Sequence, residues 1–338
     1  MKITPGKLAG LKAVSTESGT IAAAAMDQRG SLKKALAKES GHDVSDIMME
    51  DFKGAVTEVL TPHASAILLD PQWGIEPSKK RSTNAGLLLA YEESGYDNTR
   101  PGRLPDLLPL WSVRRLKEAG ANCVKVLLYY TPRDTAEVNQ EKHAFVERIG
   151  DECRTNDIPF FLEFIAYDVD GRDENGLEFA RVKPEVVAAS MAEFTQDRYG
   201  VDVMKVEIPV NMKFVEGSAS YTGQTAYAKA EVLDHFRVAA AAATKPFIYL
   251  SAGVSNEEFT ESLEMAALSE VQWAGVLCGR ATWKNGIPVY AKDGVDAFRR
   301  WLETEGTTNI GNVNERLQAA SSWFATYGVT SADALAAE

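Results

Sequence analysis

The sequence predicts an α/β protein with a (β/α)₈ barrel fold, in a single domain covering residues 1–338 with an extra helix near the C-terminal end. Two observations support this prediction. Eight short runs are almost continuously apolar, which is typical of parallel strands covered on both faces. Helical stretches lie between most of these runs. A doubly wound open sheet is the alternative that the same order of elements allows.

The expected strands span Thr20–Gln28, Ala64–Asp70, Ala85–Tyr91, Cys123–Tyr130, Pro159–Tyr167, Asp202–Val210, Pro246–Gly253 and Trp273–Arg280. The expected helices span Val44–Thr61, Asp106–Ala119, Thr135–Asn156, Lys183–Tyr199, Ala226–Ala243, Ser255–Leu268, Gly294–Glu303 and, outside the repeat, Val313–Tyr327. The connection between the second and third strands is short and polar, so any helix there is brief.

The loops support the barrel independently. Links from helix into strand are short, whereas the loops that leave strands are long and polar, at Pro71–Asn84, Glu92–Pro105, Asp168–Lys183 and Asn211–Gly223. In a parallel barrel all of these loops lie at the C-terminal face, where active sites are built. The Asp168–Lys183 loop is either a lid over the site or an acidic, solvated excursion.

Composition excludes several classes of partner. The net charge of −12 argues against a nucleic-acid partner, because a polyanion is repelled. The three cysteines (Cys123, Cys153 and Cys278) form no CxxC pair, so a reducing cytoplasm fits best. No apolar run is long enough for a signal peptide or a membrane helix. We therefore expect a cytoplasmic protein with no membrane partner, and association into a homo-oligomer is left open.

Lys205 lies in the middle of the expected strand Asp202–Val210. Burial disfavours a charged ammonium and moves the pKa of a lysine toward the neutral amine, which attacks carbonyl groups. The alternative is an ordinary ion pair, for example with Glu207, which is two residues away and therefore on the same face of the strand.

Two neighbouring strands also carry a buried ionisable residue. Lys125 lies inside the fourth expected strand and Glu163 inside the fifth. If these side chains and Lys205 all point inward, repulsion between the two amines lowers one amine pKa, and the carboxylate can move protons. A buried salt-bridge network with no catalytic role is the alternative.

The ends of three other strands carry candidate binding residues. Asp27, at the end of the first strand, can orient an amine or a hydroxyl, and Gln28 and Arg29 are donors suited to oxygen-rich ligands. This signal is weak alone, since Asp followed by polar residues also begins helices. The seventh and eighth strands end with Ser251, Gly253, Gly279 and Arg280, where small residues and an arginine suit a phosphate, although ordinary turn geometry also explains the glycines.

Other chemistries lack their motifs. The four histidines (His42, His63, His143 and His235) lie on expected helices or at their edges rather than at strand ends. A metal-dependent enzyme of this fold needs several such ligands at the mouth of the barrel. Neither a GxxxxGK[ST] loop nor a GxGxxG segment after a strand is present. The sequence therefore predicts no metal and no cofactor.

The chain resembles the Schiff-base (class I) tagatose-1,6-bisphosphate aldolases over nearly its whole length. The resemblance is carried by DQRGSLKK, SAILLDPQWG, GLLLAYEESGYD, GRLPDLLPLWSVRRLKEAGAN, VKVLLYY, IPFFLEF, DVMKVEIPVNMKFVEG, IYLSAGVS and GVLCGRATW. It implies Lys205 as the Schiff-base lysine, Glu163 as the proton-transfer residue, and Lys125 and Asp27 as tuning and orienting neighbours. It also implies phosphate contacts from Ser251, Gly253, Gly279 and Arg280 at one end and from Gln28 or Arg29 at the other.

The resemblance predicts an enzyme that cleaves a ketohexose 1,6-bisphosphate, with tagatose 1,6-bisphosphate as the expected substrate, to dihydroxyacetone phosphate and glyceraldehyde 3-phosphate. Two alternatives remain open at this point. One is an aldolase for sulfofructosephosphate or another ketose bisphosphate. The other is a phosphosugar-sensing regulatory protein that retains the site and acts by binding a partner.

Overall fold

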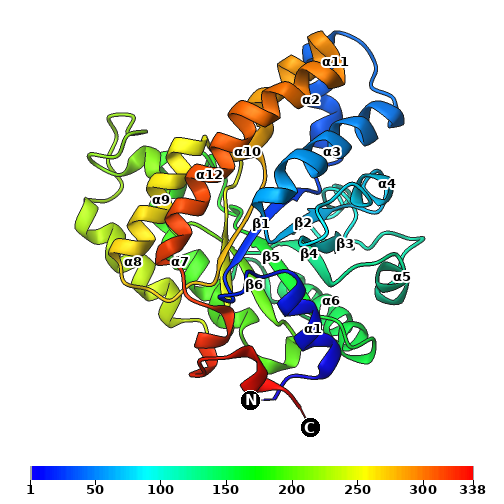
Figure 1. The fold of residues 1–338 in the computed structure, drawn as a ribbon. Coiled ribbons are helices and arrows are strands. Elements are labelled where there is room, and N and C mark those ends of the chain that lie inside the picture. Colours follow the sequence, from blue (N-terminus) through cyan, green and yellow to red (C-terminus); the bar gives the residue numbers. More distant parts are fainter. Residues whose placement is uncertain (1, 338) are drawn as a thin grey trace.

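Eight parallel strands form a closed barrel in the order β1 to β8 in this computed structural model, which describes residues 2–337 (Figure 1). The strands are Ile21–Met26 (β1), Ala66–Leu69 (β2), Gly86–Ala90 (β3), Cys123–Tyr129 (β4), Phe160–Ile165 (β5), Val203–Glu207 (β6), Phe247–Leu250 (β7) and Gly275–Cys278 (β8). Each lies within an expected strand, so the predicted (β/α)₈ fold is confirmed and the open sheet is excluded.

The helices surround the barrel in Figure 1. They are Pro5–Ala13 (α1), Gly30–Ser40 (α2), Asp46–Leu60 (α3), Ile75–Ser78 (α4), Val113–Glu118 (α5), Ala136–Thr155 (α6), Leu177–Phe194 (α7), Lys229–Ala241 (α8), Asn256–Leu268 (α9), Arg280–Trp283 (α10), Ile287–Trp301 (α11) and Thr307–Arg316 (α12). α4 is the brief helix expected between β2 and β3. The helices α1, α2 and α10 were not predicted.

Several helix boundaries differ from the prediction, among them the start of α11, which lies at Ile287 rather than at Gly294. α5 begins only at Val113, where the Ser112 hydroxyl accepts a hydrogen bond from the Arg115 amide and caps the helix. α7 begins earlier than expected, at Leu177, and continues through Pro184. Near the C-terminus, the expected helix 313–327 is shorter: α12 ends at Arg316 and is followed by 3₁₀ turns at Leu317–Ala319 and Trp323–Tyr327.

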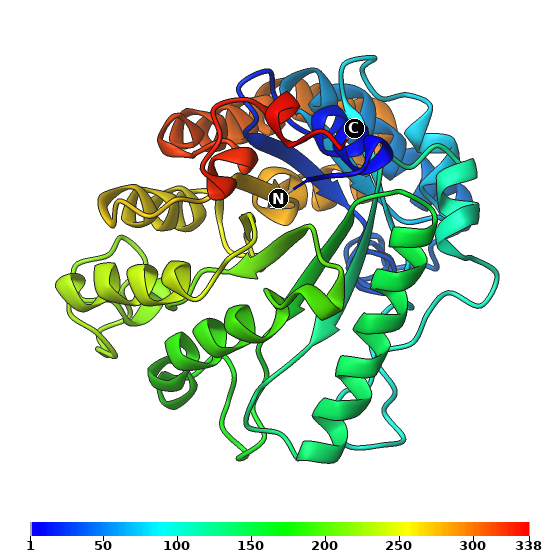
Figure 2. The same cartoon turned by 90° about the horizontal axis from the view of Figure 1, so that it is seen from below.

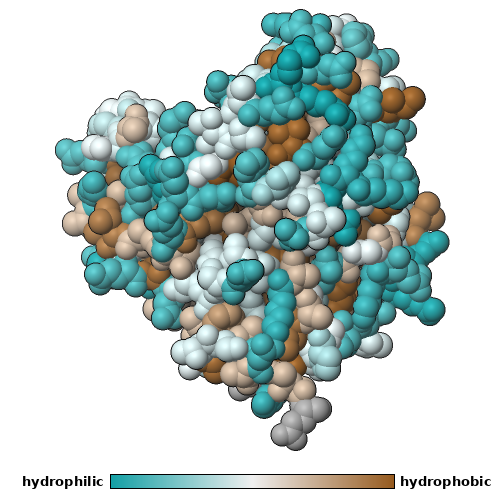
Figure 3. All heavy atoms as spheres, viewed as in Figure 1, coloured by the Kyte–Doolittle hydropathy of each residue, from teal (hydrophilic) through white to brown (hydrophobic). Residues whose placement is uncertain are grey.

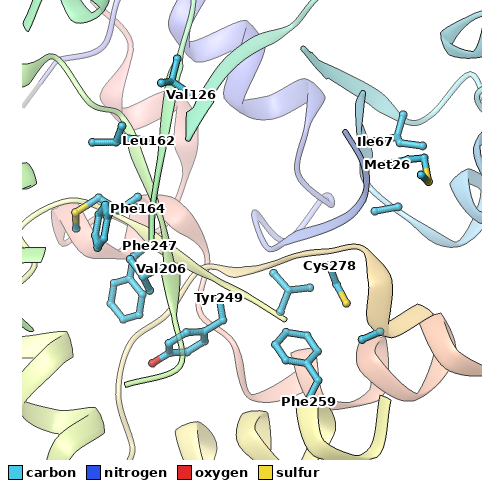
Figure 4. Close-up of a cluster of buried hydrophobic side chains, with 14 of the residues drawn as sticks. Met26, Ile67, Val126, Leu162, Phe164, Val206, Phe247, Tyr249, Phe259 and Cys278 are labelled. Carbon is cyan, nitrogen blue, oxygen red and sulfur yellow. The ribbon is translucent and has the colours of Figure 1, made fainter. Parts of the chain in front are cut away.

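Alternation along the strands divides the core into two layers. Outward-pointing side chains pack against the helices, and Figure 4 shows Val126, Leu162 and Val206 from three strands in this outer layer. Tyr249 of β7 also lies there (Figure 4), with its ring centroid 5.9 Å from that of Phe236 of α8. Because the side-chain period of a strand is two residues, the intervening residues point into the barrel.

The N-terminal half of the barrel interior is apolar and closed. Phe161, Val203 and Ile248 belong to one buried cluster with Leu11 of α1 and with Trp323. Figures 1 and 2 show the two chain ends side by side beneath the barrel, with α1 across its lower opening. This end of the barrel therefore serves as a hydrophobic plug, and the polar residues lie at the other end.

The outer surface in Figure 3 is largely hydrophilic over the projecting α2 and α11, with hydrophobic side chains scattered among the polar ones. Ile47 and Leu110 are among the exposed large hydrophobic residues, at 70% and 74% exposure. None of the helices within residues 2–337 is both long and apolar enough to cross a membrane.

Candidate active site

A pocket of about 670 Å³ opens at the C-terminal mouth of the barrel. This volume lies in the range of small-molecule sites. Every candidate residue named from the sequence lines the pocket except Lys125, which lies fully buried beside it. The residues from the sequence prediction that line it are Asp27, Gln28, Arg29, Glu163, Lys205, Ser251, Gly253, Gly279 and Arg280.

Glu163 stands between the two strand lysines. The parallel register pairs Glu163 of β5 directly with Lys205 of β6, so their side chains point into the barrel from neighbouring strands. The Oε2 atom of Glu163 lies 2.8 Å from Lys205 Nζ and 2.7 Å from Lys125 Nζ. The structure therefore brings all three residues together, as expected from three consecutive strands.

Glu207 is not the partner of Lys205. Its carboxylate lies 3.0 Å from Lys183 Nζ of α7 and accepts a hydrogen bond from the Ala166 amide at 2.7 Å. The alternative pairing considered from the sequence is therefore wrong. Glu207 follows Lys205 on the same face, but it lies nearer the strand end, where a second and smaller pocket begins.

Lys125 contacts three carboxylates. Its Nζ lies 2.8 Å from Asp27, 2.9 Å from Glu92 and 2.7 Å from Glu163. Burial lowers the pKa of this lysine, but the charges of Asp27, Glu163 and Glu92 outweigh burial and hold the pKa well above its ordinary value. The expected lowering of one amine pKa by repulsion therefore does not apply to Lys125, which is a permanent cation at neutral pH.

The two predicted acidic residues are ionised. Burial raises the pKa of Glu163, but the charges of Lys125 and Lys205 lower it by more, so its pKa lies below the usual value. The pKa of Asp27 is also lowered, because the same two ammonium charges outweigh the effect of burial. Both side chains can therefore accept protons and hydrogen bonds in the pocket.

Glu92 is a site residue that the sequence prediction missed. It lies just after β3, with Tyr91 between them, is 5% exposed and lines the pocket. It contacts Lys125, and its main-chain oxygen accepts a hydrogen bond from Arg29 Nη2 at 2.7 Å. An acidic residue immediately after an apolar strand was the available signal, because the ends of barrel strands meet at the mouth.

Several buried polar atoms on this side of the pocket lack partners. Within residues 2–337, these include Nε and Nη1 of Arg29, Oε1 of Gln28 and Oε2 of Glu92. Buried polar groups are nearly always hydrogen-bonded, to ordered water or a ligand if not to protein. Arg29 and Gln28 thus leave donors and acceptors available to an oxygen-rich ligand.

The ends of β7 and β8 also line the pocket, and β8 pairs with β1. Gly253 has a φ of +81°, which favours glycine, and a Cβ there would lie 2.7 Å from Cζ of Arg280. A Cβ on Gly279 would lie 2.8 Å from the Ala25 oxygen. Ordinary side chains are therefore excluded at both glycines, and the main chain stays uncovered beside Ser251 and Arg280.

The His, Cys, Asp and Glu side chains of residues 2–337 form no group of three placed to hold a metal ion. The carboxylates of the pocket contact ammonium and guanidinium groups instead, chiefly Lys125, Lys205 and Arg29.

Comparison with known proteins gives a consistent picture. Residues 21–285 match the model of the DeoC/LacD family aldolases. The chain is 51% identical over 330 residues to tagatose 1,6-diphosphate aldolase of Listeria monocytogenes serotype 4a (strain HCC23), covering 97% of this chain and 96% of that protein. It is also 51% identical over 326 residues to tagatose 1,6-diphosphate aldolase 2 of Enterococcus faecalis (strain ATCC 700802 / V583), covering 96% and 98%.

Solved structures share the fold at low sequence identity. A fructose-bisphosphate aldolase from Plasmodium falciparum, crystallised with TRAP and a small-molecule inhibitor, matches with a TM-score of 0.63 at 16% identity, covering 95% of this chain and 94% of that one. A Schiff-base-forming fructose-1,6-bisphosphate aldolase matches with a TM-score of 0.51 at 15% identity, covering 88% and 99%. At these identities the likeness concerns the barrel fold alone.

Proposed function

Because the chain belongs to the DeoC/LacD family of aldolases, we propose that it cleaves tagatose 1,6-bisphosphate between C3 and C4 through a Schiff base on Lys205. The resemblance noted from the sequence is thereby confirmed at the level of the family. The observation that carries the proposed mechanism is the contact between the Lys205 amine and Glu163, 2.8 Å apart inside the pocket.

The reaction begins at the substrate carbonyl. Lys205 passes a proton to Glu163, and the neutral amine attacks C2 of the open-chain ketose. The protonated carboxyl group gives its proton to the C2 oxygen, which forms a carbinolamine. The carboxylate then takes a second proton from the attacking nitrogen and passes it to the C2 hydroxyl group, which leaves as water, and an iminium ion forms. The fully buried ammonium of Lys125 stays charged beside Glu163 and keeps it acidic enough to give the proton back.

Cleavage follows from the iminium ion. The Glu163 carboxylate removes the proton of the C4 hydroxyl group, the C3–C4 bond breaks, and its electron pair moves through C2 to the iminium nitrogen. Glyceraldehyde 3-phosphate leaves. The remaining enamine is protonated at C3, and hydrolysis releases dihydroxyacetone phosphate and restores Lys205. Atoms and charges balance without any redox partner.

The two sides of the pocket bind the two phosphates in this proposal. Ser251, Gly253, Gly279 and Arg280 hold the phosphate on C1, near the C2 carbon that reacts with Lys205. Gln28 and Arg29 hold the phosphate on C6, and Nε and Nη1 of Arg29 are donors that lack a protein partner within residues 2–337. Fixing both ends aligns the scissile bond with the amine, which is where most of the rate gain from orientation arises.

Borohydride trapping tests the covalent step. Tagatose 1,6-bisphosphate plus borohydride should produce a stable adduct, and peptide mass spectrometry should place it on Lys205. Lys205→Ala should lose both the adduct and turnover. Lys183→Ala is the matched control, because Lys183 is a half-buried lysine of α7 that pairs with Glu207 of β6, and this variant should keep both. An adduct on another lysine would overturn the assignment.

The identity of the substrate is tested separately. Steady-state kinetics on tagatose 1,6-bisphosphate, fructose 1,6-bisphosphate and a sulfofructose phosphate, measured side by side, should give the highest kcat/KM for tagatose 1,6-bisphosphate. A higher value for the sulfonated sugar would assign the chain to the alternative aldolase activity. Binding of all three without any cleavage would favour the regulatory alternative.

A further inference from the structure

Lys53 is a fully buried lysine that the mechanism above does not use. It lies on α3, outside the pocket lining, and its side chain has 0% exposure. Its Nζ donates to the main-chain oxygens of Met26 at 2.7 Å and Gln28 at 2.8 Å, and it lies 2.6 Å from Oδ2 of Asp70. Three oxygen neighbours match the three protons of an ammonium group.

This arrangement costs free energy that a hydrophobic side chain would avoid. Burial lowers the pKa of Lys53, and the charge of Asp70 only offsets part of that effect. A buried ion pair is often no more stable than well-packed hydrophobic residues of similar size. Stability of the barrel therefore does not explain why an ammonium group stands at this point.

The two carbonyl groups that Lys53 binds lie on either side of Asp27. β1 ends at Met26, which pairs with Leu69 of β2. Beyond Met26, the main chain of this segment no longer pairs with β2. Lys53 donates hydrogen bonds to the main chain at this point, both before Asp27, at Met26, and after it, at Gln28. Asp27 is therefore held from two sides, with its carboxylate 2.8 Å from Lys125.

Asp70 anchors the ammonium group in turn. It follows β2, and its Oδ1 accepts hydrogen bonds from the Gln72 amide at 3.0 Å and the Trp73 amide at 2.9 Å. The carboxylate is fixed by its own turn and cannot follow Lys53 if the latter moves. The pair thus connects the start of the β2–α4 loop to the end of β1.

We propose that Lys53 is a positioning residue, which holds the backbone of residues 26–28 so that Asp27 meets Lys125 and Gln28 faces the pocket. This inference rests on the proposed function, because Asp27 and Gln28 matter for catalysis only if they act in that reaction. Lys53 does not touch the substrate. Its effect on catalysis arises through the orientation and charge of its neighbours.

The molecule provides a matched control at the other end of the barrel. Lys7 of α1 lies 2.7 Å from Asp202, with 11% and 16% side-chain exposure, and this buried pair is far from the pocket lining. Lys53→Met and Lys7→Met each leave a buried carboxylate without its partner, so both should destabilise the fold. The double variants Lys53→Met/Asp70→Asn and Lys7→Met/Asp202→Asn remove that unpaired charge and should regain stability.

Kinetics should separate the two pairs. Both Lys53 variants should lose about 10- to 100-fold in kcat/KM, since a displacement of about 1 Å in a site can cost 100-fold. The Lys7 variants should keep the wild-type value. The loss should fall on kcat more than on KM in both Lys53 variants, because Lys53 does not touch the substrate and acts through the orientation of Asp27.

A Lys53→Met/Asp70→Asn protein with wild-type kcat and KM would overturn the inference. The same holds if the Lys7 variants lose as much activity as the Lys53 variants. If Lys53→Met does not fold, the charge-neutral double variant carries the test alone. A wild-type enzyme that fails to cleave tagatose 1,6-bisphosphate would refute the proposed function. This outcome is distinct from any ratio of kcat/KM between a variant and the wild type.

Discussion

Phe161 and Glu163 stand two residues apart on β5 and point into the same barrel, but their surroundings are opposite. Phe161 is fully buried in the apolar plug, whereas Glu163 lies against two ammonium groups in the pocket. The neighbouring strands repeat this step, with an apolar residue below a lysine: Cys123 precedes Lys125 on β4, and Val203 precedes Lys205 on β6.

The difference shows how the barrel separates stability from chemistry. Two residues along a strand span about 6.6 Å, so a single step along the inward-facing row passes from one region to the other. The lower region removes apolar surface from water, which stabilises the fold. The upper region contains buried charges, whose attraction roughly balances the cost of their desolvation. A change in the upper region should therefore affect the reaction more than the fold.

Replacing the acid of the upper region should have the largest effect. Glu163→Gln keeps the shape of the side chain but removes the proton acceptor, and kcat should fall by about 100- to 10,000-fold, the usual contribution of general acid–base catalysis. Steady-state kinetics on tagatose 1,6-bisphosphate measures this. Glu207→Gln is the matched control, since Glu207 is similarly buried on the next strand but pairs with Lys183. A kcat for Glu163→Gln equal to that of Glu207→Gln would contradict the assigned role.

Replacing the aromatic ring of Phe161 in the lower region should reduce stability but not activity. Phe161→Ala leaves a cavity in the plug and should lower the free energy of unfolding by about 3–5 kcal/mol. Folded protein should keep a near-wild-type kcat/KM, because the cavity lies below the charged residues. Urea denaturation measures the loss, and Phe145→Ala on α6 is a control that should lose less, as its ring is only partly buried. Lost activity without lost stability would break the comparison.

The sequence was informative wherever alternation along a strand decides the outcome. Lys125, Glu163 and Lys205 each interrupt an apolar run, and a period of two residues places them on one face of their strands. Glu92 was assigned to a loop because it follows its run, although it continues the inward-facing row of β3 two residues beyond Ala90. The surroundings of Lys125 were therefore predicted only in part, since Glu92 is one of three carboxylates around that amine.

Contacts to the main chain were beyond the sequence. Lys53 falls inside a correctly expected helix, but its acceptors are carbonyl oxygens of Met26 and Gln28 at the end of a distant strand. No pattern of residue types encodes such a contact. The unpredicted helix α2 is a different case, because Leu32 and Leu36 do have helical spacing and are both buried. That segment was interpreted only through the polar residues before it.

The smallest expected effect compares one aspartate from each region by its pH dependence. The pKa of Asp27 is lowered, because Lys125 and Lys205 outweigh burial, whereas burial raises the pKa of Asp202 despite Lys7. Asp27 therefore adds stability above its unfolded pKa of about 3.9, and this stability is lost as pH falls. For Asp202, the cost of a buried charge disappears as pH falls through its raised pKa, so it partly opposes the loss.

Urea denaturation between about pH 3 and pH 6 should reveal the two signs. Asp27→Asn should make the acid loss of stability less steep, and Asp202→Asn should make it steeper, each by at most about 1.4 kcal/mol per pH unit, the value for one proton. Wild-type protein supplies the reference slope. If both variants changed the slope in the same direction, the two ends of the barrel would not differ in electrostatics, and the separation of chemistry from stability would have to rest on packing alone.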